Sequence, residues 1–362
     1  MVCFLTGLVA GCVLMFLIHN PTMEHEAPSP NPTVKSEVPS PNPTVKHESP
    51  SPNPTVKHEA PSPKQTLILM WLWPFGVKFD IDSCRSTRFD IDGCKLTDDR
   101  KMYNNADAVL FHHREIRSDL SNMPPSQRPP FQKWVWMNFE PPSNSPKIPG
   151  LRNLFNLTLN YRLDADITLL SGKFIPKKGN SSFPIPNKSK LVCWVVSNWK
   201  KGLQRVTYYE ELIKHIHVDG FGHSFNKPIP SQGHLGVIKQ CKFYLSFENS
   251  IHKDYMTEKL FNPLSVGTVP VVLGTSRQNY ENFLPGDAFI HVDDFPSPKE
   301  LAEHIRFLDK NEDAYRQYFN WHKHYEVQKF SSWAEHVCFT CDYIRKHKEY
   351  KVINDLDKWY WG

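Results

Sequence analysis

Residues 244–274 read YLSFENSIHKDYMTEKLFNPLSVGTVPVVLG. A short apolar strand begins the stretch, a polar loop and an amphipathic segment follow, and a second apolar strand at 269–273 precedes the closing glycine. In α/β proteins, a strand that leads through a polar loop into a helix N-terminus is a common binding place for phosphate groups. The stretch therefore predicts an α/β fold with a phosphate-bearing ligand at this loop.

The loop between the two strands is crowded with polar side chains. Lys259 can supply a point charge to a diphosphate, and Glu258 can accept hydrogen bonds from the hydroxyl groups of a sugar. The alternative is a helix whose first turn is acidic only because of its dipole. The crowding favours ligand binding; the six side chains are Glu248, Asn249, Asp254, Tyr255, Glu258 and Lys259.

The same stretch resembles the signature of the Golgi α-1,3-fucosyltransferases, glycosyltransferase family 10. The motifs of that family are FENS, DY, TEK and VPVVLG, and they stand here at 247–250, 254–255, 257–259 and 269–274. The likeness extends from about residue 67 to the C-terminus and is nearest to the brain-type, Lewis x-forming members. It implies the fold named GT-B, in which two Rossmann-like lobes face a cleft.

Apolar runs along the chain independently predict two doubly wound α/β lobes. Several runs are continuous in Val, Leu, Ile and Trp, which is typical of strands covered on both faces. The segment 171–189, rich in Gly, Pro, Ser and Asn, predicts an interlobe linker. The expected strands are 67–73, 108–112, 133–138, 191–196, 243–247, 269–273 and 289–292, and the expected helices are 205–215, 298–309 and 313–329.

The first 65 residues cannot form a packed core. Residues 2–18 are an apolar run without charge, at the lower length limit for spanning a bilayer. The run lacks the basic start and the cleavage site of a signal peptide, which favours an uncleaved signal anchor over a cleaved leader. Three repeats of the pattern SPNPTVK follow within 29–61, and their prolines predict an extended, disordered spacer.

These features and the resemblance divide the chain into five segments. The formal net charge of +5 is modest and spread out, so nucleic-acid binding is not indicated. The segments are a cytosolic tip with a transmembrane signal anchor (1–19), a Pro-rich stem (20–65), an N-terminal acceptor-binding lobe (66–175), a GDP-fucose-binding lobe (190–335) and a C-terminal segment (336–362).

The cysteines and sequons fit a lumenal domain. An even number of cysteines outside the anchor favours disulfides. The alternative is a zinc site, but the spacing of Cys84 and Cys94 is unlike that of zinc ligands. The family resemblance implies the pairs Cys84–Cys338, Cys94–Cys341 and Cys193–Cys241, which would tie the C-terminal segment to the N-terminal lobe. The predicted glycosylation sites are Asn156, Asn180 and Asn187, each in an Asn-x-Ser/Thr sequon.

Glu140 is the expected general base. Transfer of a sugar with inversion needs one carboxylate to take the proton of the acceptor hydroxyl. Glu140 follows the strand 133–138, and two prolines fix the turn after it. From the residues alone, a surface glutamate in a turn fits equally well. The family has its proposed general base in a Glu-Ser-Pro motif after an aromatic strand, which implies Glu140, although Pro141 replaces the serine.

Arg205 and Lys259 are the expected partners of the donor diphosphate. Arg205 lies in a match to the SNW…RVxYY motif of the family, and its guanidinium can hold a phosphate with two hydrogen bonds. Without the motif, Arg205 would be a cation on a helix surface. By the same resemblance, the nucleotide and fucose pocket is expected to include Ser197, Asn198, Tyr244, Asn249, Tyr255 and Glu258.

No metal or other cofactor is expected, because cations of the protein can neutralise the leaving diphosphate. Asp-x-Asp pairs leave a metal-dependent transferase as the alternative. The pairs are Asp80/Asp82, Asp90/Asp92, Asp164/Asp166 and Asp355/Asp357.

His113 and Arg114 are the expected acceptor-binding residues. In this family the residue after the His-His pair varies with the linkage that the enzyme forms, and Arg at this position accompanies α-1,3 transfer to type 2 chains. The chain departs from its nearest relatives at Val77, where they have Gln after WPFG, and at 169–172, where LLSG replaces a VPYG-like element.

The resemblance implies an inverting enzyme that transfers L-fucose from GDP-β-L-fucose to the 3-hydroxyl of GlcNAc in Galβ1-4GlcNAc, forming Lewis x-type ends. Its acceptors would be glycoproteins and glycolipids with N-acetyllactosamine ends. It would be a single-pass type II protein of the Golgi cisterna membrane, and a homodimer is a possible assembly. The alternatives are a fucosyltransferase for type 1 chains or a protein-linked core, and a non-catalytic lumenal protein that binds glycans.

Overall fold

The computed structural model describes residues 65–81, 84, 91–179, 183–330 and 332–362. All of them belong to one compact unit, 61–362. The expected membrane anchor and the expected stem up to residue 64 lie outside the described residues. Within the described part, each helix is too short or too polar to cross a bilayer.

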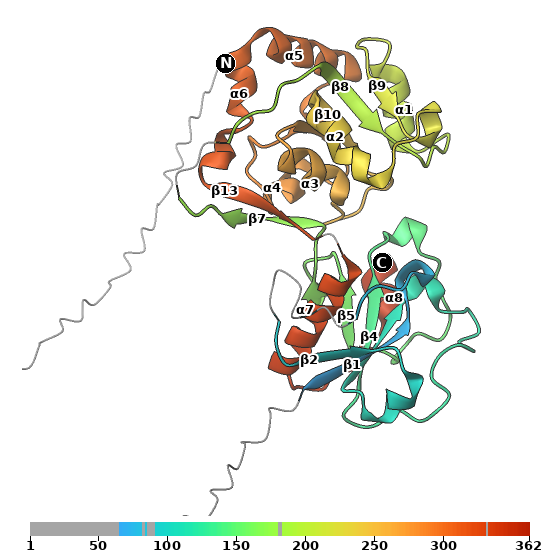
Figure 1. The fold of residues 1–362 in the computed structure, drawn as a ribbon. Coiled ribbons are helices and arrows are strands. Elements are labelled where there is room, and N and C mark those ends of the chain that lie inside the picture. The colour runs from blue at the N-terminus through green and yellow to red at the C-terminus, as the bar shows by residue number, and fades with distance from the viewer. Residues whose placement is uncertain (1–64, 82–83, 85–90, 180–182, 331) are drawn as a thin grey trace, which may run out of the picture. The chain divides into compact units, whose positions relative to one another are not determined.

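The first half of this unit is built on a parallel sheet of six strands in the order β2-β1-β3-β4-β5-β6 (Figure 1). The central strands are buried on both faces, as their continuous apolar runs predict. The strands are β1 (Thr66–Leu72), β2 (Cys94–Thr97), β3 (Ala108–His112), β4 (Lys133–Asn138), β5 (Leu157–Asn160) and β6 (Ile167–Thr168).

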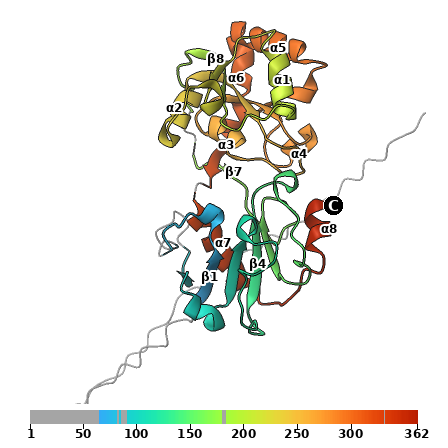
Figure 2. The same cartoon turned by 90° about the vertical axis from the view of Figure 1, so that its right-hand side faces the viewer.

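Two helices from the end of the chain cover the two faces of this sheet (Figure 2). Because side chains alternate along a strand, Ile68 and Met70 pack in one cluster with Val337 and Ile344 of α7 (Trp333–Lys346). Leu67, Leu69 and Trp71 point to the other face and pack in a second cluster with Leu356 and Tyr360 of α8 (Leu356–Trp361). The C-terminal segment is therefore part of the N-terminal core.

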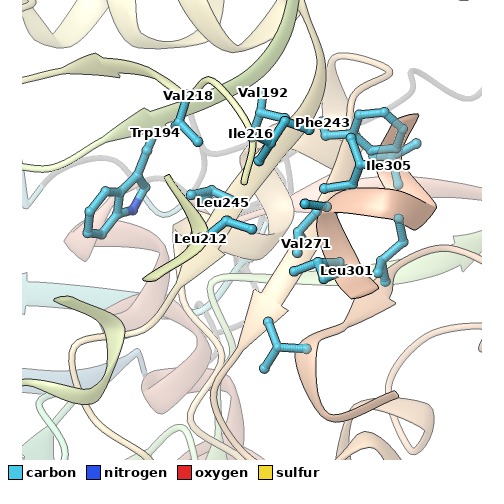
Figure 3. Close-up of a cluster of buried hydrophobic side chains, with 14 of the residues drawn as sticks. Val192, Trp194, Leu212, Ile216, Val218, Phe243, Leu245, Val271, Leu301 and Ile305 are labelled. Carbon is cyan, nitrogen blue, oxygen red and sulfur yellow. The ribbon is translucent and has the colours of Figure 1, made fainter. Parts of the chain in front are cut away.

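The second half is a parallel sheet of five strands in the order β12-β11-β10-β8-β9. One face packs against α1 and α5, where Leu212, Leu301 and Ile305 meet Leu245 and Val271 (Figure 3). Phe261 of α3 and Tyr280 of α4 pack with Val272 in a separate cluster. The elements are β8 (Lys190–Val195), α1 (Gln204–Leu212), β9 (Asp219–Phe221), α2 (His234–Lys239), β10 (Cys241–Phe247), α3 (Glu258–Ser265), β11 (Val269–Leu273), α4 (Arg277–Glu281), β12 (Ile290–His291), α5 (Pro298–Lys310) and α6 (Glu312–Gln317).

The helix expected over 313–329 is wrong for most of its length. After α6 and a 3₁₀ turn, the chain forms the strand β13 (Tyr325–Lys329), which pairs antiparallel with β7 (Gly172–Pro176). β7 in turn occupies the start of the expected linker. The exposure of β13 does not alternate between its two faces, and its pairing partner β7 is far away in the sequence, so the local pattern did not identify a strand.

The three expected disulfides are confirmed. Cys84–Cys338, Cys94–Cys341 and Cys193–Cys241 are all bonded. The first two join α7 to the region around β2, across more than 240 residues of chain. They hold α7 on the first sheet and so fix the place of the residues at its N-terminus.

The expectation of a glycan on Asn156 is wrong for the folded domain. Asn156 is fully buried, and its amide donates to the carbonyl oxygen of Lys351 at 2.7 Å. Its Oδ1 accepts from the backbone N–H of Trp134 at 2.7 Å and from Arg128 at 3.1 Å. An amide used in this way cannot carry a sugar. Asn187 is exposed, and Asn180 lies outside the described residues.

Asn156→Ala is expected to lower the free energy of unfolding by about 3 kcal/mol, because it leaves several buried polar groups without partners. Asn187→Gln is expected to leave stability unchanged and to remove one glycan from protein made in a secretory host. Urea unfolding and intact mass before and after deglycosylation measure the two effects. A glycan lost from Asn156→Ala together with unchanged stability would contradict the structural role of this amide.

Candidate functional site

The loop after β10 is closed by a buried carboxylate. Glu248 accepts hydrogen bonds from the backbone N–H and the hydroxyl of Thr257, both at 2.8 Å. Thr257 is also the N-cap of α3, since its side chain accepts from the N–H of Lys259. The short polar sequence between Glu248 and Thr257 is thereby held as a fixed loop at the carboxyl end of the central strand.

Arg205 and Lys259 lie near the N-termini of two helices and line one cavity of about 260 Å³. The positive ends of the two helix dipoles add to the positive charge of the two side chains. The cavity therefore offers two cationic side chains to a phosphate-bearing ligand, with the carboxylate of Glu258 also in its lining. Its other expected residues are Ser197, Asn198, Tyr244, Asn249 and Glu258, so the structure brings together most of the predicted donor pocket.

Arg205 is buried, with 4% of its surface exposed. One Nη donates to the carbonyl oxygen of Asn198, whereas the buried Nε has no hydrogen-bond partner among the described residues. Burial lowers the pKa of Arg205, against the opposing effect of Glu248. Burial of a guanidinium with an unpaired donor costs free energy, and an anion that binds there offsets part of this cost.

Lys259 is held between two carboxylates. Its Nζ lies 3.0 Å from Glu258 and 3.4 Å from Glu248, and it donates to the hydroxyl of Thr257 at 2.9 Å. Burial by itself would lower the pKa of Lys259, but Glu248 and Glu258 outweigh burial and raise it. The amine is therefore a fixed positive charge rather than a proton donor at neutral pH.

Glu140 lines a second cavity, of about 390 Å³, that Lys259 also lines. Its backbone N–H donates to Asn138 Oδ1 at 3.2 Å, and its carbonyl oxygen accepts from the hydroxyl of Tyr360. Its carboxylate is 3.4 Å from the amide of Asn144. These contacts hold the turn after β4, and the carboxylate stays available to the cavity.

The second cavity combines residues that follow strands of both sheets with the start of α3 and the start of α7. Tyr255, which lines it, packs edge to face on Tyr161 with ring centroids 5.0 Å apart. Burial raises the pKa of Tyr255, so its hydroxyl is protonated. The full lining is Phe75, Phe139, Glu140, Ser171, Asn249, Tyr255, Thr257, Glu258, Lys259, Phe330, Ser332, Trp333 and His336.

A third cavity, of about 570 Å³, is also lined by Glu140, and most of its other lining residues carry amides or hydroxyls. Asn249 lines all three cavities, and its Oδ1 is buried without a partner among the described residues. A series of donors and acceptors of this kind suits the hydroxyl and N-acetyl groups of a glycan. The lining is His113, Arg114, Asn138, Glu140, Asn144, Ser145, Pro146, Asn198 and Asn249.

His113 lies in the wall of this third cavity with both ring nitrogens occupied. Its Nε2 bonds the carbonyl oxygen of Pro146 at 2.9 Å, and its Nδ1 accepts from the indole N–H of Trp136 at 3.2 Å. A carbonyl only accepts and an indole only donates, so the proton is on Nε2. Burial lowers the pKa of His113 to about 4, which keeps the ring neutral.

We therefore expect the free energy of unfolding to fall as the pH drops below about 6.5. In the unfolded chain His113 then binds a proton, whereas in the folded protein it binds one only near pH 4. The contribution of one such histidine is about 2 kcal/mol between pH 7 and pH 5. His113→Gln should show a shallower pH dependence in urea unfolding, whereas the exposed control His217→Gln should match the wild type. Equal slopes in all three proteins would contradict the assignment.

Arg114 is exposed at the same cavity, and its guanidinium lies 4.9 Å from the ring centre of Phe75. Phe75 itself adopts a left-handed backbone with φ of 53° and lines the second cavity. Val77, in place of the glutamine of the family, is exposed. Arg114 and Phe75 thus join the third and second cavities along one edge.

Asp254 ties the two sheets together beside Tyr255. Its carboxylate accepts from the backbone N–H of Leu163 at 3.1 Å and from the amide of Asn279 at 2.8 Å. It is buried and adopts a left-handed backbone with φ of 63°. Asp254 is therefore a positioning residue of the loop, and the sequence had not separated it from the ligand-binding side chains.

Sequence reasoning missed the wall formed by the start of α7 and the residues just before it. Phe330, Ser332, Trp333 and His336 line the cavity of Glu140, although the sequence gives them no phosphate or sugar motif. Phe139 was also missed, and its place directly before Glu140 is the one signal that could have identified it.

The Asp-x-Asp pairs have other partners where they are described. Asp164 pairs with Arg162, Asp166 accepts from Thr158, and Asp355 pairs with Arg152. Within the described ranges, no three His, Cys, Asp or Glu side chains gather as metal ligands would.

Two family models match the chain in succession. The model described as fucosyltransferase, N-terminal, matches residues 63–172, and the model described as glycosyltransferase family 10 (fucosyltransferase) C-term matches residues 185–359. The first range contains the six-stranded sheet. The second contains the five-stranded sheet and also α7 and most of α8, the helices that cover the first sheet.

Curated relatives are similar over most of their length. The 4-galactosyl-N-acetylglucosaminide 3-alpha-L-fucosyltransferase 9 of Bos taurus is 51% identical over 298 residues, which cover 82% of this chain and 83% of that protein. The 3-galactosyl-N-acetylglucosaminide 4-alpha-L-fucosyltransferase FUT3 of Pongo pygmaeus is 44% identical over 299 residues, covering 81% and 80%. A crystal structure of an alpha1,3-fucosyltransferase with GDP-fucose is 18% identical, has a TM-score of 0.51, and covers 82% of this chain and 94% of its own; it shares the fold.

Proposed function

This chain belongs to glycosyltransferase family 10, the fucosyltransferases, and on that premise we propose that it transfers L-fucose from GDP-β-L-fucose to the 3-hydroxyl of GlcNAc in Galβ1-4GlcNAc ends. The product is a Lewis x-type glycan. The identity of 51% to a 4-galactosyl-N-acetylglucosaminide 3-fucosyltransferase supports the type 2 acceptor, since the relative that acts on 3-galactosyl chains is less similar, at 44%.

The observation that carries the proposal is the order of charges along the adjoining cavities. Glu140 and Lys259 line one cavity, and Lys259 and Arg205 line the next. Glu258 lines both cavities and pairs with Lys259, so the carboxylate that has no cationic partner among the described residues lies at one end and the two cations at the other. This order matches the two ends of the reaction, in which a hydroxyl loses a proton and a diphosphate leaves.

In this proposal, the diphosphate of the donor occupies the cavity of Arg205 and takes the unused Nε–H donor. Lys259, already fixed by Glu248, adds the second positive charge. Glu140 accepts the proton of the acceptor 3-hydroxyl as the oxygen attacks the anomeric carbon from the side opposite the leaving GDP. The configuration at the anomeric carbon of fucose is thereby inverted, and the negative charge on the leaving GDP forms next to the two cations. No metal is assigned a role, because these side chains supply the positive charge.

The division of labour follows from the same assignment. We propose that 66–175 binds the acceptor, that 190–335 binds the donor, and that 336–362 completes the acceptor side through its disulfides, as two Rossmann-like lobes of the GT-B type. Residues 1–19 are proposed as a signal anchor and 20–65 as a stem of a type II protein of the Golgi membrane. The proposal allows a homodimer, with glycoproteins and glycolipids as acceptors.

A soluble chain from residue 64 onward, made in a secretory host, tests the function directly. Incubation with GDP-fucose should fucosylate N-acetyllactosamine and leave the type 1 isomer Galβ1-3GlcNAc nearly unmodified. Mass spectrometry and linkage analysis identify the product. Preference for the type 1 isomer or for a protein-linked core would change the acceptor, and GDP binding without transfer to any acceptor would indicate a non-catalytic protein.

A further inference from the structure

We propose that His336 binds one hydroxyl group of the acceptor sugar through its Nε2. This inference rests on the proposed function, because it assigns a ligand to the cavity that contains Glu140. His336 belongs to the first turns of α7, on the wall that no sequence motif identified.

The hydrogen bonding of His336 fixes which nitrogen is free. Its Nδ1 lies 2.8 Å from the carbonyl oxygen of Ser332. Because a carbonyl oxygen only accepts, Nδ1 carries the proton, and Nε2 keeps its lone pair. Among the described residues, no hydrogen-bond partner of Nε2 is found, and this atom is not one of the fully enclosed unpaired atoms. An acceptor nitrogen thus remains open to a ligand.

The packing around the ring leaves it little freedom to turn away. Phe139 meets it edge to face with ring centroids 4.7 Å apart, and Trp333 lies at 5.3 Å. The helix beneath is joined to the first sheet by the disulfides of Cys338 and Cys341. A hydrogen-bond acceptor that is fixed before the ligand arrives loses little entropy on binding.

The cavity offers a sugar complementary surfaces on two sides. His336 and Glu140 line the same space, together with the aromatic rings of Phe75 and Trp333. Aromatic rings pack against the C–H faces of a sugar, while its hydroxyls seek polar groups at the ring edge. Burial lowers the pKa of His336, so the ring is neutral at pH 7 and its Nε2 accepts rather than donates.

In this placement two side chains contact different hydroxyls of one acceptor sugar and have different roles. Glu140 takes the proton of the hydroxyl that reacts, whereas His336 accepts from a second hydroxyl that does not react and so fixes how the sugar lies. Loss of this contact should therefore weaken the binding of the acceptor and leave the binding of the donor unchanged.

Two amide variants test the proposal against a purely structural role. Asparagine places its amide near the position of Nδ1, so His336→Asn can keep the bond to Ser332 but cannot reach into the cavity. Glutamine places its amide oxygen near the position of Nε2, so His336→Gln can still accept from the sugar. We expect the acceptor KM to rise about ten-fold in His336→Asn, as for the loss of one hydrogen bond, and to stay within about three-fold in His336→Gln.

The hydroxyl is identified with monodeoxy analogues of N-acetyllactosamine. One analogue should bind about ten-fold more weakly to the wild type than the parent sugar does, and this difference should vanish in His336→Asn. The KM for GDP-fucose and the Tm should stay at wild-type values in both variants. The dissociation constant of each sugar in the presence of GDP, measured by NMR titration, gives the same comparison without turnover.

Three results would overturn the proposal. The first is that each deoxy analogue loses the same affinity in wild type and in His336→Asn. The second is that the acceptor KM rises more in His336→Gln than in His336→Asn. The third is that the KM for GDP-fucose rises together with the acceptor KM. A wild type that binds N-acetyllactosamine but makes no product would refute the proposed function and leave the His336 assignment to the NMR comparison. A wild type that binds none would refute both.

Discussion

Glu140→Gln is expected to lower kcat by about 10²- to 10⁴-fold, the range that general base catalysis contributes. Glutamine has the shape of glutamate and can keep the contact with Asn144 at 3.4 Å, so the fold and the binding of both substrates should persist. Only the capacity to take a proton is lost. Initial rates with GDP-fucose and N-acetyllactosamine, together with GDP titration, separate turnover from binding.

The matched control is Glu303→Gln in α5, where the glutamate is exposed and lies 3.9 Å from Lys299. It changes the same atoms far from the cavities and should keep the wild-type kcat. If Glu140→Gln turns over within a few-fold of the wild type, another group takes the proton. Glu258 would then be the next carboxylate to examine, because it lines the same cavity.

Arg205→Ala is expected to raise the KM for GDP-fucose and the dissociation constant of GDP by about 100-fold or more. The substitution removes a charged hydrogen bond to phosphate in a desolvated place, where such a loss costs about 2–5 kcal/mol. Lysine restores the charge but not the planar fork, so Arg205→Lys should recover only part of the affinity. Calorimetric titration with GDP measures both variants directly.

Arg316→Ala, at an exposed arginine of α6 that pairs with Glu312 at 3.0 Å, is the control. It should leave GDP affinity and Tm unchanged. Arg205→Ala removes a buried charge whose Nε has no partner among the described residues, but it also removes the Nη bond to the carbonyl oxygen of Asn198, so its Tm is measured beside its GDP affinity. Unchanged GDP affinity in Arg205→Ala would show that the diphosphate binds elsewhere.

The predicted donor pocket is the part of the site that the local sequence describes best. β10, the loop with Glu248, and α3 follow one another without a break, so residues close in sequence remain close in space. Arg205 comes from a different helix, and the resemblance to the family supplied what periodicity alone could not. The roles of these side chains stay predictions until the variants above are measured.

The acceptor side shows what local sequence misses. His113 lines the third cavity, and its expected contact with the acceptor stays a prediction; only the structure shows that both of its ring nitrogens are already bonded, to Pro146 and Trp136. His336 carried no motif, but it lies in the cavity of Glu140. Asn156 is an intact sequon, but its amide is fully buried. In each case, the residue type was visible and its surroundings were not.

By itself, the sequence determined the parallel α/β class and the central strands, because continuous apolar runs record burial on both faces wherever the chain later goes. With the resemblance to the family, it also determined the disulfide pairs. The tertiary structure alone decided that α7 and α8 cover the first sheet, that β13 is a strand beside β7, and that the start of α7 faces Glu140. These outcomes depend on contacts between segments more than 140 residues apart, and periodicity within a segment shows which side is buried but not what covers it.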